Sequence, residues 1–286
     1  MVTGAPKRLS RIVSLASAMT LGLAAIMPTS TMAAAYASPQ PPASHWITST
    51  NYRYPGNDGK HHAVSWDKYS YMIDDHHLNI WSGEVHYWRL PSPHQWRDVL
   101  QKMKAAGFNA VSFYFFWGYH QSAPDSPFDF SGIRNIDLLL RMAAEEGLYV
   151  IARPGPYINA EISMGGMPAW QTNSSLPLRN AWDNTNWQQQ RAWLHAVNKI
   201  IARHQVTNGG GSVLLYQVEN EELASVGPYA DYVKKIIKAA KEDGINVPIF
   251  HNDYAPVGNW AFTTKDTGLD VYSCLLYTSD AADDLL

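Results

Sequence analysis

A repeated alternation of short apolar runs and longer amphipathic segments most restricts the possible folds of this chain. Apolar runs at Ala110–Trp117 and Leu148–Ala152 each follow a segment with helical periodicity, at Ser92–Ala106 and Asn135–Glu146. A glycine follows both helical segments, as is common where a helix ends. Strand and helix units that repeat in this order predict a parallel sheet that is covered by helices.

The alternation continues along the chain and predicts about six strands, so we expect an α/β fold of the (β/α)₈ TIM barrel type. An open, doubly wound sheet is the alternative, but such a sheet usually has a glycine-rich phosphate loop after its first strand. Here the first strand contains Gly83-Glu84-Val85-His86, which is not such a loop. The other predicted elements are strands at Ile80–Trp88, Val213–Val218, Val247–Phe250 and Leu269–Tyr272 and helices at Trp187–His204 and Tyr229–Glu242.

Upstream of these units, Ala63–Asp74 alternates apolar and polar residues. This pattern predicts a short β-hairpin that closes the amino-terminal end of the barrel. We assign residues 61–273 to the barrel. Because a complete barrel has eight strands in about 250 residues or more, we expect this one to be truncated after about six strands. Such an open barrel would expose strand edges and an apolar lumen, so we expect poor solubility.

The amino terminus has the pattern of a secretory signal peptide, which we assign to residues 1–37. Basic residues precede a small apolar run at 12–27, and Ala-x-Ala cleavage sites follow it. A linker is expected at 38–60, and the protein is expected to be secreted and extracellular. An uncleaved membrane anchor is the alternative, but the run is short and rich in alanine.

Composition bears on the partners of the protein and on its carboxy-terminal end. A net charge of −3 over 286 residues argues against nucleic acid or a membrane surface as a partner. No H-x-x-x-H or C-x-x-C motif is present, so we expect no metal and no cofactor. Cys274 opens the segment 274–286, which resembles a translated sequencing adapter and is expected to be a non-native tail. A genuine acidic tail is the alternative.

The most informative polar residues follow the apolar run Val213–Tyr216, in the stretch Gln217-Val218-Glu219-Asn220-Glu221. In a parallel β/α scaffold, the carboxyl ends of the strands carry the chemistry. A carboxyl beside an amide that binds a sugar hydroxyl is what a glycosidase needs for its proton donor. The alternative is a solvated strand end that happens to carry several acids.

Polar residues also follow the other predicted strands. Two prolines stiffen Arg153–Glu161 and bring Asn159 and Glu161 to the rim, where they would bind vicinal hydroxyls at little entropic cost. A structural turn is the alternative for this segment. The remaining candidates are Tyr114 and Trp117 as pocket-lining aromatics, His120 as a hydrogen-bonded loop histidine, and Glu84, His86 and Arg89 as an ion-paired group in the barrel interior.

Five stretches occur in this order along the chain: Ser82–Tyr87, Lys102–Asn109, Arg153–Glu161, Gly165–Trp170 and Gln217–Glu221. Together they resemble glycoside hydrolase family 35, the β-galactosidases. The resemblance implies a retaining, exo-acting glycosidase that removes terminal β-linked galactose. It also implies that Glu221 is the general acid/base, that Asn220 holds the 2-hydroxyl, and that Tyr114, Asn159, Ala160 and Glu161 bind the galactose ring.

A retaining glycosidase needs a second carboxyl about 5–5.5 Å from the first. The resemblance implies that this nucleophile follows a seventh strand, which we expect to be absent from the chain. Asp253 and Asp270 are the late rim carboxyls before the tail, and neither matches the expected context. A related β-glycosidase such as a β-glucosaminidase, and a non-catalytic sugar-binding remnant, are the alternatives.

This chain also departs from the family's usual pattern just after the motif. It carries Glu222 where the family usually has an aromatic residue. A desolvated carboxylate close to Glu221 would raise the pKa of Glu221 and favour proton donation.

Overall fold

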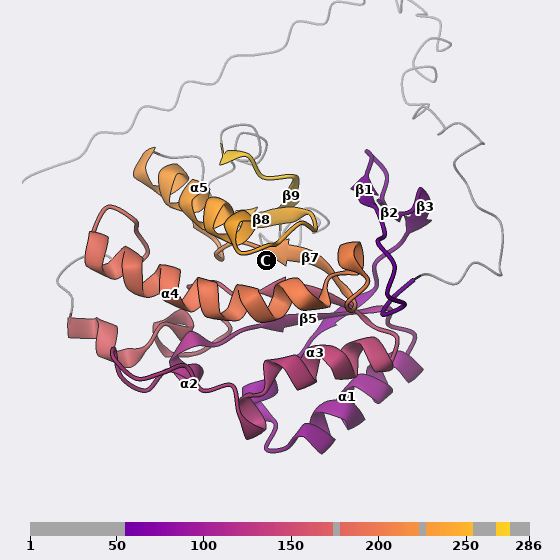
Figure 1. Cartoon of the computed structure of the whole chain (residues 1–286), viewed down its shortest axis with the longest axis horizontal. Helices are drawn as coiled ribbons and strands as arrows, with labels where there is room; N and C mark the ends of the chain where they lie inside the picture. The colour runs from indigo at the N-terminus through magenta and orange to yellow at the C-terminus, as the bar shows by residue number, and fades with distance from the viewer. Residues whose placement is uncertain (1–54, 174–177, 223–226, 254–266, 275–286) are drawn as a thin grey trace, which may run out of the picture. The chain divides into compact units, whose positions relative to one another are not determined.

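The computed structural model describes residues 55–173, 178–222, 227–253 and 267–274. Within these residues the chain forms a small antiparallel sheet and a six-stranded parallel sheet with flanking helices (Figure 1). An α/β fold with a parallel sheet is thus confirmed. The predicted signal peptide, most of the predicted linker and residues 275–286 of the predicted tail lie outside the described residues.

The small sheet consists of β1 (Val64–Trp66), β2 (Tyr71–Ile73) and β3 (His76–Leu78), paired antiparallel in that order. The predicted hairpin therefore gains a third strand. The turn between β2 and β3 is made by Asp74 and Asp75, whose φ angles of 49° and 63° suit a tight two-residue hairpin turn. The polar pair His76-His77 gives no alternating signal, which is why the sequence did not predict β3.

The six strands of the large sheet lie side by side in the order of the chain, and every adjacent pair is parallel. Consecutive strands are therefore joined by crossovers, most of which contain a helix. The strands are β4 (Ser82–Glu84), β5 (Ala110–Tyr114), β6 (Tyr149–Arg153), β7 (Val213–Gln217), β8 (Ile249–Asp253) and β9 (Val271–Cys274).

The long helices begin where the sequence supplies a capping side chain. Ser92, Asn135 and Asp183 each accept a hydrogen bond from the backbone N–H three residues later. Each long helix packs against the next one along the chain, α1 on α3, α3 on α4 and α4 on α5 (Figure 1). The α-helices are α1 (Pro93–Ala105), α2 (Trp117–His120), α3 (Ile136–Glu145), α4 (Asn184–Ile201) and α5 (Gly227–Glu242); the 3₁₀ helices are η2 (Tyr87–Arg89), η3 (Gly132–Arg134), η4 (Ser163–Gly166), η5 (Ala169–Asn173), η6 (Ala202–His204) and η7 (Val206–Asn208).

Two strands are shorter than predicted because large side chains turn into the core. Strand β4 stops at Glu84, and Tyr87 in η2 is fully buried with its carbonyl accepting a hydrogen bond from Trp96 Nε1 at 3.1 Å. Strand β5 stops at Tyr114, and Trp117 opens α2 instead. Trp117 is fully buried and lies parallel to Trp193 at a centroid distance of 6.3 Å, so it belongs to the core and does not line the rim.

A second apolar cluster joins the small sheet to the large one. Ile73 and Leu78 pack with Ala110 and Tyr149, the first residues of β5 and β6. The small sheet therefore packs against the amino-terminal ends of the parallel strands, where the sequence placed the hairpin. This leaves the opposite, carboxyl ends of the strands for the loops that carry the polar residues.

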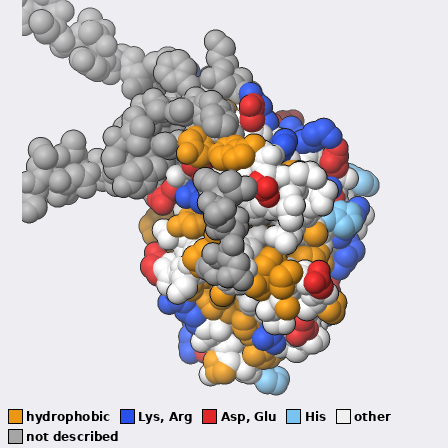
Figure 2. Space-filling model, turned by 90° about the vertical axis from the view of Figure 1, so that its left-hand side faces the viewer, with side chains coloured by type: hydrophobic (Ala, Val, Ile, Leu, Met, Phe, Trp, Pro, Cys, Tyr) orange, Lys and Arg blue, Asp and Glu red, His pale blue; other side chains and the backbone are white. Residues whose placement is uncertain are grey.

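On the face shown in Figure 2, hydrophobic side chains form patches among scattered acidic and basic ones. This mixture agrees with the small net charge of −3. Among the described residues, no helix combines the length and the apolar character needed to cross a bilayer.

Candidate active site

Arg153, the last residue of β6, contacts residues at the carboxyl ends of three other strands of the sheet, β4, β5 and β7. Its Nη1 donates to Glu84 Oε2 at the end of β4, at 3.0 Å. Its Nη2 donates to Asn220 Oδ1 after β7, also at 3.0 Å. Its guanidinium lies 3.8 Å from the ring centroid of Tyr114, the last residue of β5. Tyr114 and Asn220, both predicted site residues, are thus brought together by an arginine.

The side-chain amide of Asn220 is held by three N–H donors. Its Oδ1 accepts from Arg153 at 3.0 Å, from Gln217 Nε2 at 3.3 Å and from Asn252 Nδ2 at 3.4 Å. Gln217 Nε2 also donates to Asn252 Oδ1 at 2.7 Å, which ties β7 to β8. Asn220 is only 3% exposed, so this oxygen is fixed in a mostly dry environment.

Glu221 sits on a strained turn directly after Asn220. Glu219 and Glu221 have φ angles of 57° and 56°, which residues other than glycine rarely adopt. The backbone N–H of Glu221 donates to the carbonyl of Asn252 at 3.1 Å. Such strain persists only where the surroundings hold it, and it is common at functional sites.

The surroundings that hold this turn are centred on Arg179. Its Nε and Nη2 donate to the two carboxylate oxygens of Glu219 at 2.8 and 2.6 Å, and Nη2 also donates to the carbonyl of Asn220 at 2.5 Å. Burial opposes the charge of Arg179, but the carboxylates of Glu219 and Glu222 raise the pKa of its guanidinium. Its guanidinium lies 4.0 Å from the ring centroid of Tyr157.

Glu222 belongs to the same ion-paired group. Its Oε2 lies 3.0 Å from Arg179 Nε, and the residue is 7% exposed. Its negative charge is therefore offset only in part, because it shares Arg179 with Glu219. The expected effect of Glu222 on Glu221 stays a prediction, and this ion pair would weaken it.

The loop after β6 carries the other predicted sugar-binding residues. Asn159, Ala160 and Glu161 have consecutive φ angles of 56°, 52° and 49°, a left-handed turn of non-glycine residues. Arg89 Nη2 donates to the carbonyls of Ala160 at 3.0 Å and Glu161 at 3.4 Å and so holds this turn. Ala160 is buried, Asn159 is half-buried and Glu161 is exposed.

Charged groups of this loop and of the rest of the site act together on the Tyr114 hydroxyl. Burial raises the pKa of the Tyr114 hydroxyl, and the carboxylates of Glu84, Glu161 and Glu221 raise it further, while Arg153 lowers it. The Tyr114 hydroxyl therefore stays protonated and lies in the field of all three carboxylates.

The predicted group of Glu84, His86 and Arg89 is only partly correct. Glu84 Oε1 lies 2.7 Å from His86 Nε2, as expected for a paired acid. The arginine that pairs with Glu84 is Arg153, however, whereas Arg89 donates a hydrogen bond to the loop after β6.

Two further predictions concern His120 and the late carboxyls. His120 is hydrogen-bonded, as predicted, since its ring nitrogens lie 2.6 Å from the Tyr87 hydroxyl and 2.7 Å from the Asp129 carbonyl. It is the last residue of α2, however, and does not lie in a loop. Asp270 is not a rim residue, because its Oδ2 accepts from the N–H of Ile249, the first residue of β8, at 2.9 Å. It lies at the amino-terminal end of the sheet, and the side chain of Asp253 is outside the described part.

Comparison with known proteins decides the family. Residues 70–285 match the family model described as glycosyl hydrolases family 35. The chain belongs to glycosyl hydrolase family 35. The predicted resemblance is thereby confirmed.

Curated relatives of this family 35 chain share its sequence over most of its length. It is 47% identical over 217 residues to "Probable beta-galactosidase C" of Aspergillus clavatus, which covers 73% of this chain and 22% of the relative. The protein of the same name from Sclerotinia sclerotiorum is 42% identical over 203 residues, covering 69% of this chain and 20% of the relative. The chain thus spans about a fifth of the length of these relatives.

Among solved structures, GH5_18 from Streptomyces cattleya in complex with GlcNAc is similar with a TM-score of 0.50. The match has 18% sequence identity and covers 62% of this chain and 45% of that chain. At this identity the similarity concerns the fold alone.

Sequence reasoning missed several residues that organise the site of this family 35 chain. Gln217 ends the otherwise apolar strand β7, and Asn252 lies in the polar second half of β8, a signal that was available in the sequence. Arg179 lies in a long segment without periodicity, 40 residues before Glu219, and only the fold brings the two together. No group of three or more potential metal ligands occurs in the described part of the chain.

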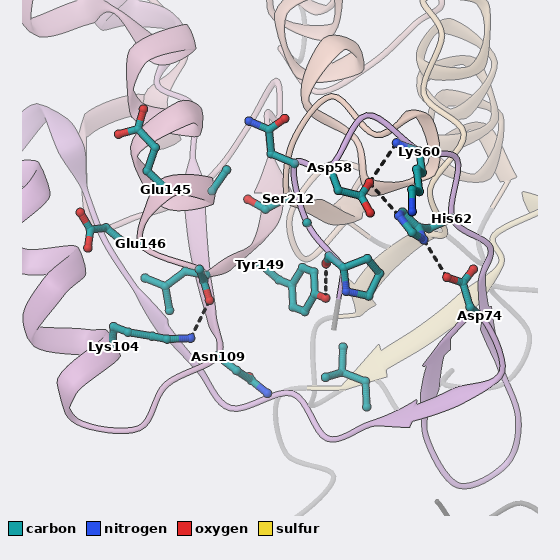
Figure 3. A pocket seen from close by; sticks show the side chains of 17 residues that line it. Asp58, Lys60, His62, Asp74, Lys104, Asn109, Glu145, Glu146, Tyr149 and Ser212 are labelled. Carbon is teal, nitrogen blue, oxygen red and sulfur yellow. Dashed lines mark hydrogen bonds and ion pairs between the residues drawn. The ribbon is translucent and has the colours of Figure 1, made fainter. Parts of the chain in front are cut away.

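A hollow of about 1130 Å³ lies elsewhere, at the amino-terminal ends of the strands (Figure 3). Asn109 and Ser212, which line it, directly precede β5 and β7. His62 in its wall is already paired with Asp58 at 3.0 Å and Asp74 at 2.6 Å. Despite its size, this hollow is at the wrong end of the sheet for chemistry carried on strand carboxyl ends.

Proposed function

We propose that this chain forms the first six strands of a (β/α)₈ barrel in a retaining, exo-acting β-galactosidase. The substrate is the terminal, non-reducing β-D-galactosyl residue of an oligosaccharide or polysaccharide. Two observations support the proposal: membership of family 35 and relatives named as beta-galactosidases. The single structural observation that carries it is the Asn220-Glu221 pair on a strained turn at the end of β7.

Glu221 is proposed as the general acid/base. Its turn is fixed from both sides, by Arg179 through Glu219 and by the Asn252 carbonyl through the Glu221 N–H. A carboxyl on a backbone held in this way can protonate the glycosidic oxygen as the leaving group departs. It then deprotonates the water that hydrolyses the glycosyl-enzyme.

The galactose ring is proposed to bind between the loop after β6 and the end of β5. Asn220 would contact the 2-hydroxyl, and Asn159, Glu161, the Ala160 backbone and the Tyr114 hydroxyl would contact the rest of the ring. The left-handed turn at 159–161 and the stacked Arg153 hold these groups before the ligand arrives. Groups that are already ordered lose little entropy when a ligand binds.

The nucleophile is proposed to be a carboxylate from sequence that this chain does not contain. It attacks the anomeric carbon from the face opposite Glu221 and forms a covalent glycosyl-enzyme, and the leaving group takes the proton of Glu221. The proposal also includes export of the protein after removal of a signal peptide at residues 1–37, which the basic and apolar pattern of that segment supports.

The test compares this chain with a longer gene product that contains it, on nitrophenyl β-galactoside and nitrophenyl β-glucosaminide. The proposal predicts that the longer product hydrolyses the galactoside in strong preference, and that the chain alone hydrolyses neither. In the longer product, Glu221→Gln should lower kcat by roughly 10²–10⁴-fold. Glu242→Gln, on an exposed part of α5, is the matched control and should retain full activity. A longer product that prefers the glucosaminide would contradict the assignment of the sugar.

A further inference from the structure

Arg153 fixes the direction in which the Asn220 amide faces. Three N–H groups, from Arg153, Gln217 and Asn252, converge on one atom of the amide at 3.0, 3.3 and 3.4 Å. Donors can converge only on an oxygen, so the network identifies Oδ1 and places the NH₂ group on the other side. No described residue pairs with that NH₂ group. Asn220 therefore offers donors alone to anything that enters the site.

The charge on Arg153 strengthens this arrangement. Its side chain is 12% exposed and, among the described residues, is ion-paired with one carboxylate, that of Glu84, at 3.0 Å. Burial lowers the pKa of the guanidinium, while Tyr114, Glu84 and Glu221 favour its charged form. A hydrogen bond from a charged donor is roughly twice as strong as one between neutral groups, so Arg153 dominates the three donors on Oδ1.

The contacts of Arg153 are not those expected of a residue that only stabilises the fold. Its Nε is buried without a hydrogen-bond partner among the described residues. An unmet buried donor is costly. Its two Nη atoms and the face of its guanidinium instead contact Glu84, Asn220 and Tyr114. Asn220 and Tyr114 are proposed to bind the sugar, and Glu84 adjoins them.

We infer that Arg153 is a positioning residue that sets specificity at the sugar position facing Asn220. This inference rests on the proposed function, in which that position is C2 of the terminal sugar. A hydroxyl at C2 accepts a hydrogen bond from the fixed NH₂ group. An ammonium at C2 has only donors, and it would also meet the nearby positive charge of Arg153. The site therefore takes β-galactosides with a free 2-hydroxyl and rejects 2-amino-2-deoxy sugars.

The kinetic test uses a longer gene product that contains this chain, with nitrophenyl β-galactoside and its 2-amino-2-deoxy analogue as substrates. Arg153→Met should lower kcat/KM for the galactoside by roughly 10–100-fold. It should also reduce the ratio of kcat/KM for the galactoside to kcat/KM for the 2-amino-2-deoxy analogue by about tenfold or more. In an Asn220→Ala background the same change should cost less than about threefold, because the two residues act as one unit. The inference would be overturned if Arg153→Met lowered kcat/KM equally for both substrates. It would also be overturned if the change lowered kcat/KM as much in the Asn220→Ala background as in the protein that retains Asn220.

Arg134→Met is the matched control. Arg134 also lies over a tyrosine ring, 4.4 Å from the centroid of Tyr119, and pairs with a carboxylate, Asp129, at 3.5 Å. It makes none of the contacts with Asn220 described above. This variant should leave the ratio of the two kcat/KM values within about twofold of the unmodified protein.

A second measurement needs no catalysis. In this chain, ¹⁵N relaxation of the Asn220 side-chain amide should show a rigid NH₂ group that becomes mobile in Arg153→Met and stays rigid in Arg134→Met. An equally rigid amide in Arg153→Met overturns the inference whatever the activity. If the amide responds as expected but the longer product hydrolyses neither substrate, the proposed function fails and the positioning role of Arg153 stands.

Discussion

Arg179 binds both carboxylate oxygens of Glu219, with Nε to Oε1 at 2.8 Å and Nη2 to Oε2 at 2.6 Å. Glu219 is 1% exposed and lies two residues before Glu221 on a backbone with positive φ. This bidentate pair therefore supports the strained turn that presents Glu221. An arginine from the segment before α4 thus determines the geometry at the end of β7.

Removal of Arg179 should destabilise the protein strongly. Arg179→Met leaves the buried Glu219 carboxylate without its partner, and we expect the free energy of unfolding to fall by about 3 kcal/mol. Urea denaturation measures this change. Arg97→Met is the control, because Arg97 pairs with Glu145 and Glu146 near the surface, and it should cost at most about 1 kcal/mol. Similar losses for the two variants would contradict the role of Arg179.

Substitution of Glu222 should affect stability more than the pH profile. The Glu222 carboxylate lies 3.0 Å from Arg179 Nε, so it is ion-paired, although it shares this arginine with Glu219. We expect Glu222→Gln to lower the denaturation midpoint while the alkaline limb of the pH–rate profile of the longer product, where the proton donor loses its proton, stays in place. A clear displacement of that limb would show instead that Glu222 tunes the pKa of Glu221.

Gly165 should tolerate no side chain. It has a φ of 55°, and a Cβ there would lie 2.0 Å from Tyr157 Cε2. Gly165→Ala must push the Tyr157 ring away from Arg179 and should weaken sugar binding as well as stability. Gly132→Ala is the matched control, since Gly132 has a φ of 53° but open space around it. The control should show only the backbone cost of about 1–2 kcal/mol, measured by denaturation. Equal costs at the two sites would show that the ring contact is unimportant.

His120 should make the protein less stable in acid. Burial lowers its pKa to about 4 from the ordinary value of 6.5. Between these values the unfolded chain binds a proton that the folded chain does not, so the free energy of unfolding falls as the pH falls. The full effect is up to roughly 3 kcal/mol. Urea denaturation at pH 7, 6 and 5 should show a weaker pH dependence for His120→Gln than for the unmodified protein. An identical dependence would rule out this contribution.

Much of the fold was predictable because local residues set the boundaries of its elements. The caps Ser92 and Asn135 fix the starts of α1 and α3, and the apolar runs of β6 and β7 are bounded by polar residues. The third strand of the small sheet was not predictable from alternation, since it depends on a turn of two aspartates with positive φ.

The site residues were predictable only where one segment contains both the strand that places a side chain and the side chain that carries the chemistry. Asn220 and Glu221 follow a clear strand, so their place at its carboxyl end could be inferred. The residues that hold them come from elsewhere. Arg153 is 67 residues before Asn220, and Asn252 is 32 residues after it. Such contacts depend on the order of strands in the sheet, which local patterns do not encode.

The most direct test of Glu221 as the proton donor is the dependence of the rate on the leaving group. The longer gene product and its Glu221→Gln variant are compared on nitrophenyl β-galactoside and on a galactosyl disaccharide. A sugar leaving group needs a proton far more than nitrophenolate does. The account predicts that Glu221→Gln slows formation of the glycosyl-enzyme from the disaccharide much more than from the nitrophenyl galactoside. An equal reduction of that step for both substrates would contradict it.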